Sequence, residues 1–314
     1  MIKTPICDLF GIEYPIFQGG MAWIADARLA AAVSNGGGLG IISAMNAGPD
    51  YLREQIRAAR EMTEKPFGVN IMLMSPHAEE VAAVCAEERV PVVTTGAGNP
   101  SKYMPMWRKA GIKVVPVIAS VAMAKMVARA GAAAVVAEGG ESGGHVGETT
   151  TLVLVPQVAD AVDIPVIAAG GIGDGRGVAA CFMLGAQGVQ LGTRFLVATE
   201  CSVHENYKKK ILSASDIATI TTGKRLGHPV RSLKTPFSRR YAKAEYSDMA
   251  NHELEQLAVG ALRKAALEGD NENGCFLAGQ ISGMVSREQP AAEMIREIFE
   301  EAEQMLKGAG KWVK

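Results

Sequence analysis

The sequence predicts an α/β protein in which strands and helices alternate to form a (βα)8, or TIM, barrel. Three observations predict this fold. Eight short apolar segments begin roughly 20 to 31 residues apart, helical segments lie between them, and no central break interrupts the series. Strands of a parallel sheet are buried on both faces and therefore read as nearly continuous apolar runs. Eight successive strand–helix units are typical of a barrel.

The predicted strands lie in segments that each end in glycine or polar residues. Their sequences are YPIFQGGM from residue 14, GLGIISAMN from 38, PFGVNIMLMS from 66, VPVVTTGAG from 90, IKVVPVIAS from 112, AAAVVAEGG from 132, IPVIAAGGI from 164 and GVQLGTRF from 188. The segments between them have apolar residues at helical spacing. In the helix predicted over 50–65, for example, Leu52, Ile56 and Ala59 share one face.

A doubly wound sheet is the structural alternative, because it also alternates strands and helices. Its dinucleotide-binding fingerprint, G-x-G-x-x-G, would have to follow the first strand. In this chain GGGLG at residue 36 precedes a strand, and GGIGDGRG at residue 170 has a different spacing. The barrel is therefore the predicted fold.

The pattern changes after the eighth strand. We expect residues 1–199 and 275–314 to form the barrel with its terminal helix. Residues 200–274 are expected to form a small insert, or cap, packed on the barrel. Both parts belong to one chain without a long linker or a low-complexity segment.

Two further helices are predicted in the C-terminal third. HELEQLAVGALRKAALEG predicts a single helix over 252–269, with Leu254, Leu257 and Ala261 in line. A last helix is predicted over about 291–306, where apolar residues again recur at helical spacing.

Composition favours a cytoplasmic protein. With 314 residues, 48% of them hydrophobic, the chain can bury a sizeable core. The five cysteines are an odd number, widely spaced and without CxxC pairs, which argues against disulfides or a zinc site. The N-terminal segment MIKTPICDLFGIEYPIF lacks a secretory pattern, and the apolar stretches are shorter than a membrane span. We therefore expect no membrane partner.

Charge is unevenly distributed along the chain, whose formal net charge is −1. Between residues 207 and 243 ten basic residues stand against one acid, which leaves 22 basic and 32 acidic residues elsewhere. Such a basic segment can steer an anionic partner, and a solvated surface or a subunit contact would explain it equally well. Nucleic acid is not expected, because aromatic residues are too sparse to form stacking platforms.

The carboxyl ends of barrel strands are where chemistry takes place. Small residues follow the seventh strand in AAGGIGDGRG and the eighth in LGTRF, and their N–H groups, near a helix N-terminus, suit a phosphate. The alternative is that these glycines only form turns. The other strand ends supply 18–21, Asn46, Asn70, 94–98 and 138–145.

His145 is the candidate for proton or hydrogen-bond chemistry. It lies in EGGESGGHVGE, a glycine-rich and hinge-like segment directly after a strand end. A lone histidine is more often structural, but this position and the flanking glycines favour contact with a ligand near neutral pH. Asn70 suits the edge of a heterocycle, and Glu138 needs a partner in its apolar setting. The other histidines show no metal-ligand spacing and are expected to be structural: His77, His204, His228 and His252.

Eight motifs in order carry a resemblance to a known enzyme family. They are PIFQGGMAW, AVSNGGGLGII, KPFGVNIMLMSP, VPVVTTGAGNP, AEGGESGGHVGE, IPVIAAGGIGDGRG, VQLGTRF and GHPVR. Together they resemble the FMN-dependent enoyl-[acyl-carrier-protein] reductases II, which are relatives of the nitronate monooxygenases (2-nitropropane dioxygenases). The resemblance covers essentially the whole chain.

The resemblance implies FMN at the mouth of a TIM barrel, with NADH or NADPH as reductant. The implied reaction is reduction of a trans-2-enoyl thioester on acyl carrier protein, the last step of fatty-acid elongation. It also implies a homodimer and, in some members, a monovalent cation. His145 matches the family's catalytic histidine, and Gly171, Gly192 and Thr193 would hold the FMN phosphate. The other residues implied to bind FMN are Gly20, Met21, Ala22, Asn70, Glu138 and Gly144.

An acyl carrier protein as partner would explain the basic segment between residues 207 and 243. Such carriers are acidic, and complementary charge mainly raises the association rate. Lys208, Lys209 and Lys210 are expected to dock it. The chain departs from the family pattern at Gly140, where a bulkier residue is usual, and in GQISG, where GQSAG is usual.

Three alternatives stay open. A nitronate monooxygenase would use the same FMN scaffold with O2, and its histidine would act as a base; KPFGVNIMLMSP and the basic insert favour the reductase. A non-catalytic module that binds flavin or carrier protein would show no turnover. A sugar-phosphate isomerase on a bare barrel would be colourless.

Overall fold

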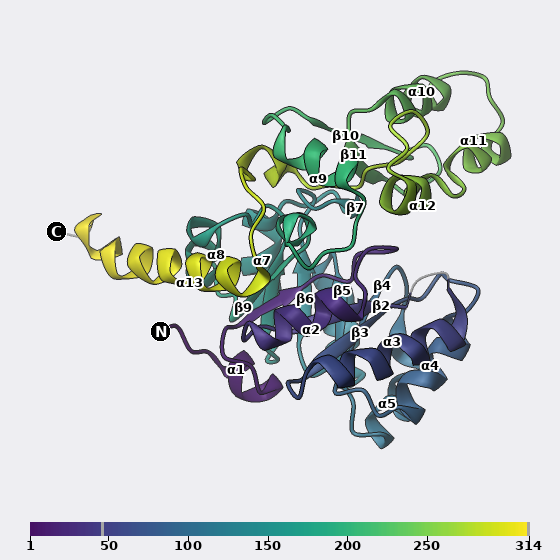
Figure 1. Cartoon of the computed structure of the whole chain (residues 1–314). Helices are drawn as coiled ribbons and strands as arrows, with labels where there is room; N and C mark the ends of the chain where they lie inside the picture. Colours follow the sequence, from purple (N-terminus) through teal and green to yellow (C-terminus); the bar gives the residue numbers. More distant parts are fainter. Residues whose placement is uncertain (45–46, 313–314) are drawn as a thin grey trace.

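Eight parallel strands form a nearly closed barrel, which confirms the predicted fold class (Figure 1). The computed structural model describes residues 1–44 and 47–312. Around the barrel the strands follow the order β1-β9-β8-β6-β5-β4-β3-β2. Each lies within one of the predicted apolar segments: β1 (Ile16–Gln18), β2 (Gly40–Ser43), β3 (Phe67–Met72), β4 (Val92–Gly96), β5 (Lys113–Ile118), β6 (Val135–Glu138), β8 (Val166–Ala169) and β9 (Gly188–Leu191).

A buried glutamine closes the barrel between β1 and β2. The backbones of these strands meet only in a parallel bridge between Phe17 and Leu39, with the Gln18 N–H donating to the Leu39 oxygen at 3.0 Å. The Gln18 side chain is fully buried. Its Oε1 accepts the Ile41 N–H at 3.0 Å, and its Nε2 donates to the Ile41 oxygen at 3.2 Å. Gln18, expected among the residues at the ligand-facing strand ends, instead satisfies backbone groups that a regular ladder would pair.

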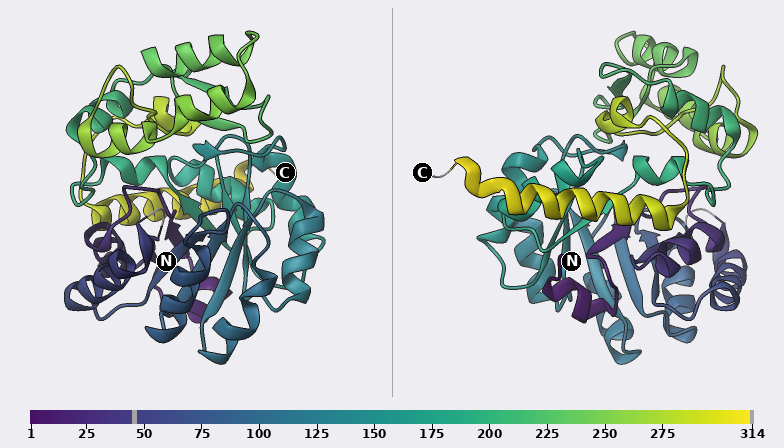
Figure 2. Two further views of the ribbon diagram at one scale, coloured as in Figure 1. Left: turned by 90° about the vertical axis from the view of Figure 1, so that its right-hand side faces the viewer. Right: turned by 60° about the vertical axis from the view of Figure 1, so that its left-hand side comes forward.

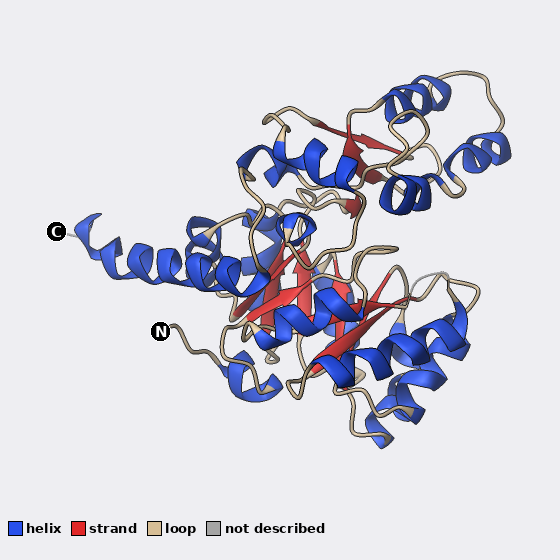
Figure 3. Cartoon of the chain, in the orientation of Figure 1, coloured by secondary structure: helices blue, strands red, loops and turns tan. Residues whose placement is uncertain are grey.

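Helices cover the outer face of the barrel (Figure 3). The helix predicted over 50–65 is confirmed as α3, with Leu52, Ile56 and Ala59 buried on its inner face. The barrel helices are α2 (Ala27–Asn35), α3 (Gly48–Met62), α4 (Ala78–Glu87), α5 (Met104–Lys109), α6 (Val121–Arg129), α7 (Thr151–Ala159) and α8 (Gly175–Met183). The short 3-10 helix η2 (Thr193–Val197) follows β9.

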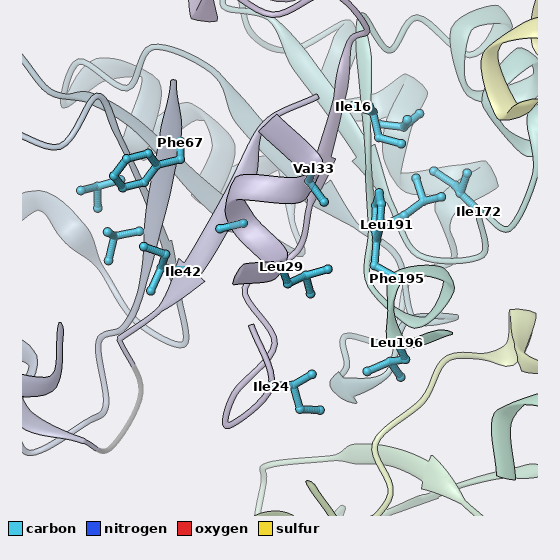
Figure 4. Packing of buried hydrophobic residues seen from close by; sticks show 14 of the residues in the cluster. Ile16, Ile24, Leu29, Val33, Ile42, Phe67, Ile172, Leu191, Phe195 and Leu196 are labelled. Carbon is cyan, nitrogen blue, oxygen red and sulfur yellow. The ribbon is translucent and has the colours of Figure 1, made fainter. Parts of the chain in front are cut away.

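Two apolar layers stabilise this arrangement. The larger lies between the strands and the surrounding helices, where Leu29 and Val33 of α2 belong to one cluster with strand residues such as Ile42 (Figure 4). The alternate strand residues fill the interior of the barrel. There Phe17 meets Phe10 of α1 (Pro5–Phe10) edge to face, with ring centroids 5.1 Å apart. The N-terminal helix α1 therefore contributes to the interior layer.

A cap of mixed structure lies over one end of the barrel (Figure 2). Its elements are α9 (Glu205–Leu212), β10 (Thr219–Thr222), β11 (Val230–Leu233), α10 (Pro236–Glu245), α11 (Asn251–Ala258) and α12 (Ala261–Arg263). β10 and β11 form an antiparallel hairpin, and β11 also pairs with β7 (Gly144–His145). Because β7 belongs to the connection between β6 and α7, the cap and the barrel share one small sheet.

The single helix predicted over 252–269 is wrong. α11 ends at Ala258, Gly260 adopts a φ of 74°, and the chain then turns into α12. Residues 264–268 continue as a π-helix. Glycine tolerates the left-handed conformation because it has no Cβ, so the helix breaks although the apolar spacing continues. Leu257, expected on the buried face, is 44% exposed.

The C-terminal helix predicted over 291–306 is confirmed as α13 (Ala291–Gly308), with Met294, Ile298 and Phe299 buried. It packs against α8 and α2, the position that the eighth helix of a barrel would take. None of the helices in the described part of the chain is both long and apolar enough to cross a membrane.

Replacing Gln18 with leucine should destabilise the barrel, because the Ile41 N–H and oxygen would lose their buried partners. We expect the free energy of unfolding to fall by about 3 kcal/mol. Urea unfolding measures this, with Gln157→Leu as control, since the exposed Gln157 bonds only within its own helix. Equal stabilities for the two variants would contradict the closing role of Gln18.

Candidate functional site

A cavity of about 510 Å³ lies at the carboxyl ends of the barrel strands, under the cap. Its size is in the range of sites for small ligands and cofactors. The residues that the sequence predicts for the site all line this cavity: Gly20, Met21, Ala22, Asn70, Glu138, Gly144, His145, Gly171, Gly192 and Thr193. The structure thus brings them together, while their individual roles stay predictions. Asn46 lies outside the described residues.

One wall of the cavity depends on the close approach of Gly20 and Asn70. The Asn70 Oδ1 accepts the hydroxyl of Thr94 at 2.9 Å, which leaves the Asn70 NH2 group available to a ligand. A Cβ added to Gly20 would lie 2.2 Å from the Asn70 Cβ. Only glycine therefore allows Asn70 to occupy its place in the cavity.

Unused donors gather beyond β8 and β9. The N–H groups of Gly171 and Gly192 find no acceptor among the described residues. Thr193 Oγ1 accepts the Gly279 N–H at 2.8 Å, so its own hydroxyl hydrogen can donate to a ligand. Backbone and hydroxyl donors in this arrangement suit a phosphate group.

The N-terminus of α8 is not part of this donor set, although the sequence places it nearby. Asp174 accepts the N–H groups of Arg176 at 3.0 Å and Gly177 at 3.3 Å. Glu301 from α13 accepts the Gly175 N–H at 2.8 Å. Carboxylates of the protein therefore accept the N–H groups at the N-terminus of α8. Only the N–H groups of the glycines before this helix can bind an anion.

Two glutamates line the cavity, Glu138 from the end of β6 and Glu141 from the connection between β6 and α7. Burial raises the pKa of Glu138 to about 7, because the apolar surroundings disfavour the charged carboxylate. Glu141 belongs to the strand-end segment 138–145, but the sequence analysis gave it no role. It accepts the Thr151 N–H at 2.9 Å and the Thr151 hydroxyl at 3.0 Å. It thereby caps α7, where the helix dipole favours an anion. Near neutral pH the Glu138 carboxyl can therefore donate a hydrogen bond in its protonated form or accept one in its ionised form.

His145 lies in a strand and not in a freely hinged loop, so that expectation is wrong. It pairs with Val230 of β11 in the cap sheet. The N–H of the next residue, Val146, donates to the Pro229 oxygen at 3.0 Å. These bonds hold the backbone against the cap while the side chain stays exposed to the cavity.

A second histidine faces the same cavity. His228, expected to be structural, lines it from the loop between β10 and β11. Although its side chain faces the cavity, the surrounding protein partly removes His145 from water, which lowers its pKa below the usual 6.5, and the nearby His228 lowers it further. The His145 imidazole is therefore mostly neutral at pH 7. The signal for His228 was available in the motif GHPVR.

The basic segment is partly built into the cap. Lys208 is only 9% exposed, and its Nζ donates to the Ala198 oxygen at 2.8 Å and to Glu288 Oε1 at 2.6 Å. The docking role predicted for Lys208 therefore does not hold. Lys209 and Lys210 lie on the same helix, α9, and are not among its buried residues.

Metal and thiol chemistry find little support. Within residues 1–44 and 47–312, no group of three or more His, Cys, Asp or Glu side chains is placed to hold a metal ion. All five cysteines are free. Burial raises the pKa of Cys181 to about 12 and that of Cys275 to about 11, so neither is a reactive thiolate.

A family model described as nitronate monooxygenase matches residues 3–88 and 77–301 of the chain. The chain belongs to this family. The structure of FabK from Thermotoga maritima is 50% identical over 100% of both chains, with a TM-score of 0.98.

Two curated relatives in the nitronate monooxygenase family carry different names. A (3aS,4S,5R,7aS)-5-hydroxy-7a-methyl-1-oxo-octahydro-1H-indene-4-carboxyl-CoA dehydrogenase of Mycobacterium tuberculosis is 33% identical over 100% of this chain and 99% of its own length. A probable nitronate monooxygenase of Staphylococcus aureus is 32% identical over 97% of this chain and 98% of its own length. The family therefore establishes an oxidoreductase and leaves the substrate open.

Members of the nitronate monooxygenase family are flavoproteins, and the residues of this cavity fit FMN. The free N–H groups of Gly171 and Gly192 with the Thr193 hydroxyl offer donors for its phosphate. The Asn70 amide, beside Gly20, can donate to a heterocycle edge. These two groups of donors line one cavity.

Replacing Gly20 with alanine should abolish flavin binding, because the new Cβ would displace Asn70. We expect the flavin absorbance per protein to fall at least tenfold, with unchanged circular dichroism. Gly308→Ala is the control, since a Cβ there meets nothing within 4 Å. A Gly20→Ala protein that stays fully yellow would rule out this packing argument.

Replacing Glu138 with glutamine should stabilise the flavin-free protein at high pH. The folded state holds the Glu138 proton up to about pH 7, whereas the unfolded chain loses it near 4.5. The free energy of unfolding therefore falls as pH rises from 4.5 to 7, by up to about 3 kcal/mol, because the unfolded chain releases a proton that the folded state must retain.

Urea unfolding at pH 8 and pH 5 separates this effect from a general one. The gain in stability from Glu138→Gln should be large at pH 8 and small at pH 5. Glu54→Gln, an exposed glutamate on α3, should change little at either pH. An equal gain at both pH values would contradict the burial of an ionisable group.

Proposed function

We propose that this protein is an FMN-dependent enoyl thioester reductase that uses NADH or NADPH and takes its substrate from acyl carrier protein. The match to FabK, an enoyl-[acyl-carrier-protein] reductase II, carries this proposal, because it is 50% identical over the whole of both chains. The M. tuberculosis relative is also named for a coenzyme A thioester. Lys209 and Lys210 remain the residues proposed to contact the acidic carrier.

The shape of the cavity supports an acyl substrate. The donors suited to phosphate follow β8 and β9, whereas Met72, Val117 and Met123 line the cavity from β3, β5 and α6. In the strand order β3 lies across the barrel from β8, whereas β5 is separated from β8 only by β6. Methionine side chains are unbranched and adapt to chains of different length. A flavin held by its phosphate thus leaves an apolar side of the cavity for an acyl chain.

Bound FMN would supply the redox chemistry, accepting hydride from NAD(P)H and passing it to Cβ of the enoyl thioester. The protein contributes position and electrostatics. As hydride reaches Cβ, negative charge develops on the thioester oxygen, and a proton from water then adds at Cα to give the saturated thioester. Neutral His145 can donate a ring N–H to that oxygen, and a donor so placed is worth about 3 kcal/mol. The β7–β11 ladder holds the His145 backbone ready for this bond.

A nitronate monooxygenase is the second candidate. The family model and the S. aureus relative favour it, and a neutral His145 could equally accept a proton from a nitroalkane. The two reactions differ in their need for NAD(P)H and for O2.

Nicotinamide oxidation by the FMN-loaded protein separates these candidates. One cuvette contains a 2-enoyl thioester with NADH or NADPH, and another contains propyl nitronate under air. We expect thioester-dependent oxidation of the nicotinamide. Nitronate consumption without NAD(P)H, together with no thioester reduction, would make the protein a monooxygenase.

Replacing His145 with alanine should lower kcat/KM for the thioester about 100-fold while FMN stays bound. In the unchanged protein, kcat/KM should rise as pH falls below 6.5 through the lowered pKa of His145, because the charged imidazolium donates a stronger hydrogen bond to the developing negative charge. This rise at acid pH should be absent from the variant. His252→Ala, on the exposed part of α11, is the control; an unaltered pH profile in His145→Ala would exclude the donor role.

A further inference from the structure

We propose that the loop between β10 and β11, residues 223–229, binds the phosphate groups of the substrate that enters the cavity. The proposal rests on the function proposed above. NAD(P)H and phosphopantetheine thioesters both have an uncharged reacting group at one end and phosphate groups farther along the molecule. This site is separate from the donors beyond β8 and β9, which suit the FMN phosphate.

The loop forms part of the rim of the cavity. Gly227, His228 and Pro229 line it directly. Figure 1 shows β10 and β11 above β7, on the side of the cap that faces the barrel. A ligand whose reacting end reaches His145 therefore has its more distant groups near this loop.

The cap interior fixes the conformation of the loop. The carboxylate of Glu245, only 4% exposed, accepts the N–H groups of Gly223 at 3.0 Å and Arg225 at 2.9 Å. The Arg225 guanidinium in turn donates to the carbonyl of Ser247 at 3.0 Å and to that of Met249. The loop is thus pre-organised, so little ordering is needed when a ligand binds.

Lys224 is left to act on a ligand. Six of the ten basic residues between 207 and 243 have partners inside the protein: Lys208, Lys209, Lys210, Arg225, Arg231 and Arg240. The Lys224 side chain is exposed and makes no hydrogen bond or ion pair with the described residues. Its carbonyl accepts the Gly227 N–H at 3.0 Å, which places it in the same turn as His228.

A lysine and a histidine in the same turn match the chemistry of a phosphate ester. The lysine ammonium supplies a point charge with three donors, and the imidazole supplies a further N–H. Of the basic residues without internal partners, Lys224 belongs to the loop that lines the cavity, whereas Lys234, Arg239 and Lys243 lie outside that loop. Lys224 is therefore the one of these four basic residues that the cap places beside the cavity.

Calorimetric titration of the FMN-loaded protein tests the proposal without relying on turnover. The probes are NAD⁺, which carries the dinucleotide phosphates but cannot reduce the flavin, coenzyme A, and a crotonyl N-acetylcysteamine thioester, which lacks phosphate. Lys224→Gln should weaken binding of a phosphate-bearing probe about fivefold at low salt, and His228→Gln should weaken the same probe. Lys113→Gln is the matched control, because Lys113 is an exposed lysine at the opposite, amino end of β5.

The pattern of losses identifies the source of the phosphate. Weaker binding of NAD⁺ alone supports the proposal with the dinucleotide as ligand, and weaker binding of coenzyme A alone supports it with the pantetheine arm. Affinities equal to those of Lys113→Gln would overturn it, as would an equal loss for the phosphate-free thioester. Failure of the proposed function would appear differently, as no thioester-dependent NAD(P)H oxidation by the unchanged protein.

Discussion

The backbone pairing of β7 with β11 is the constraint on which the candidate site depends. β7 lies within the connection that leaves β6, and β11 belongs to the cap, so this ladder fixes the cap to the barrel and His145 to the cavity. Arg231 reinforces it by donating from Nη2 to the Gly140 oxygen at 2.9 Å, across 91 residues of sequence. Because of these bonds the glycine-rich segment is a fixed wall of the cavity. The glycines serve close packing here more than motion: a Cβ on Gly143 would lie 2.6 Å from the backbone of Ala278.

The cavity holds several groups at a cost to the stability of the ligand-free protein. Glu138 is buried with its pKa raised to about 7, and the N–H groups of Gly171 and Gly192 lack acceptors among the described residues. Gly20 and Asn70 meet so closely that neither position tolerates a larger residue beside the other. Such features add nothing to the fold itself, and a bound ligand that satisfies them would stabilise the folded state. They therefore mark a binding site more strongly than any single glycine motif in the sequence.

The sequence alone predicts best those features that depend on residues close together in the chain. Each barrel strand could be predicted because it is apolar on both faces, and the strand ends then placed all the site residues on one rim. Contacts between distant segments could not be predicted. In the sequence Lys208 resembles any surface lysine, but in the fold it is buried and paired with Glu288, which lies 80 residues away. His228 lines the cavity only because the β10–β11 hairpin lies over the barrel. The break at Gly260 was missed because the apolar spacing of α11 and α12 continues through it.

The most direct test of the central claim uses the flavin itself as the reporter. The FMN-loaded protein is reduced with one equivalent of NADH without oxygen and then mixed rapidly with crotonyl coenzyme A. A thioester reductase should recover its yellow absorbance in a fast phase that depends on thioester concentration, and His145→Ala should slow that phase. An enzyme that stays bleached with the thioester and regains colour only when air is admitted would contradict the account.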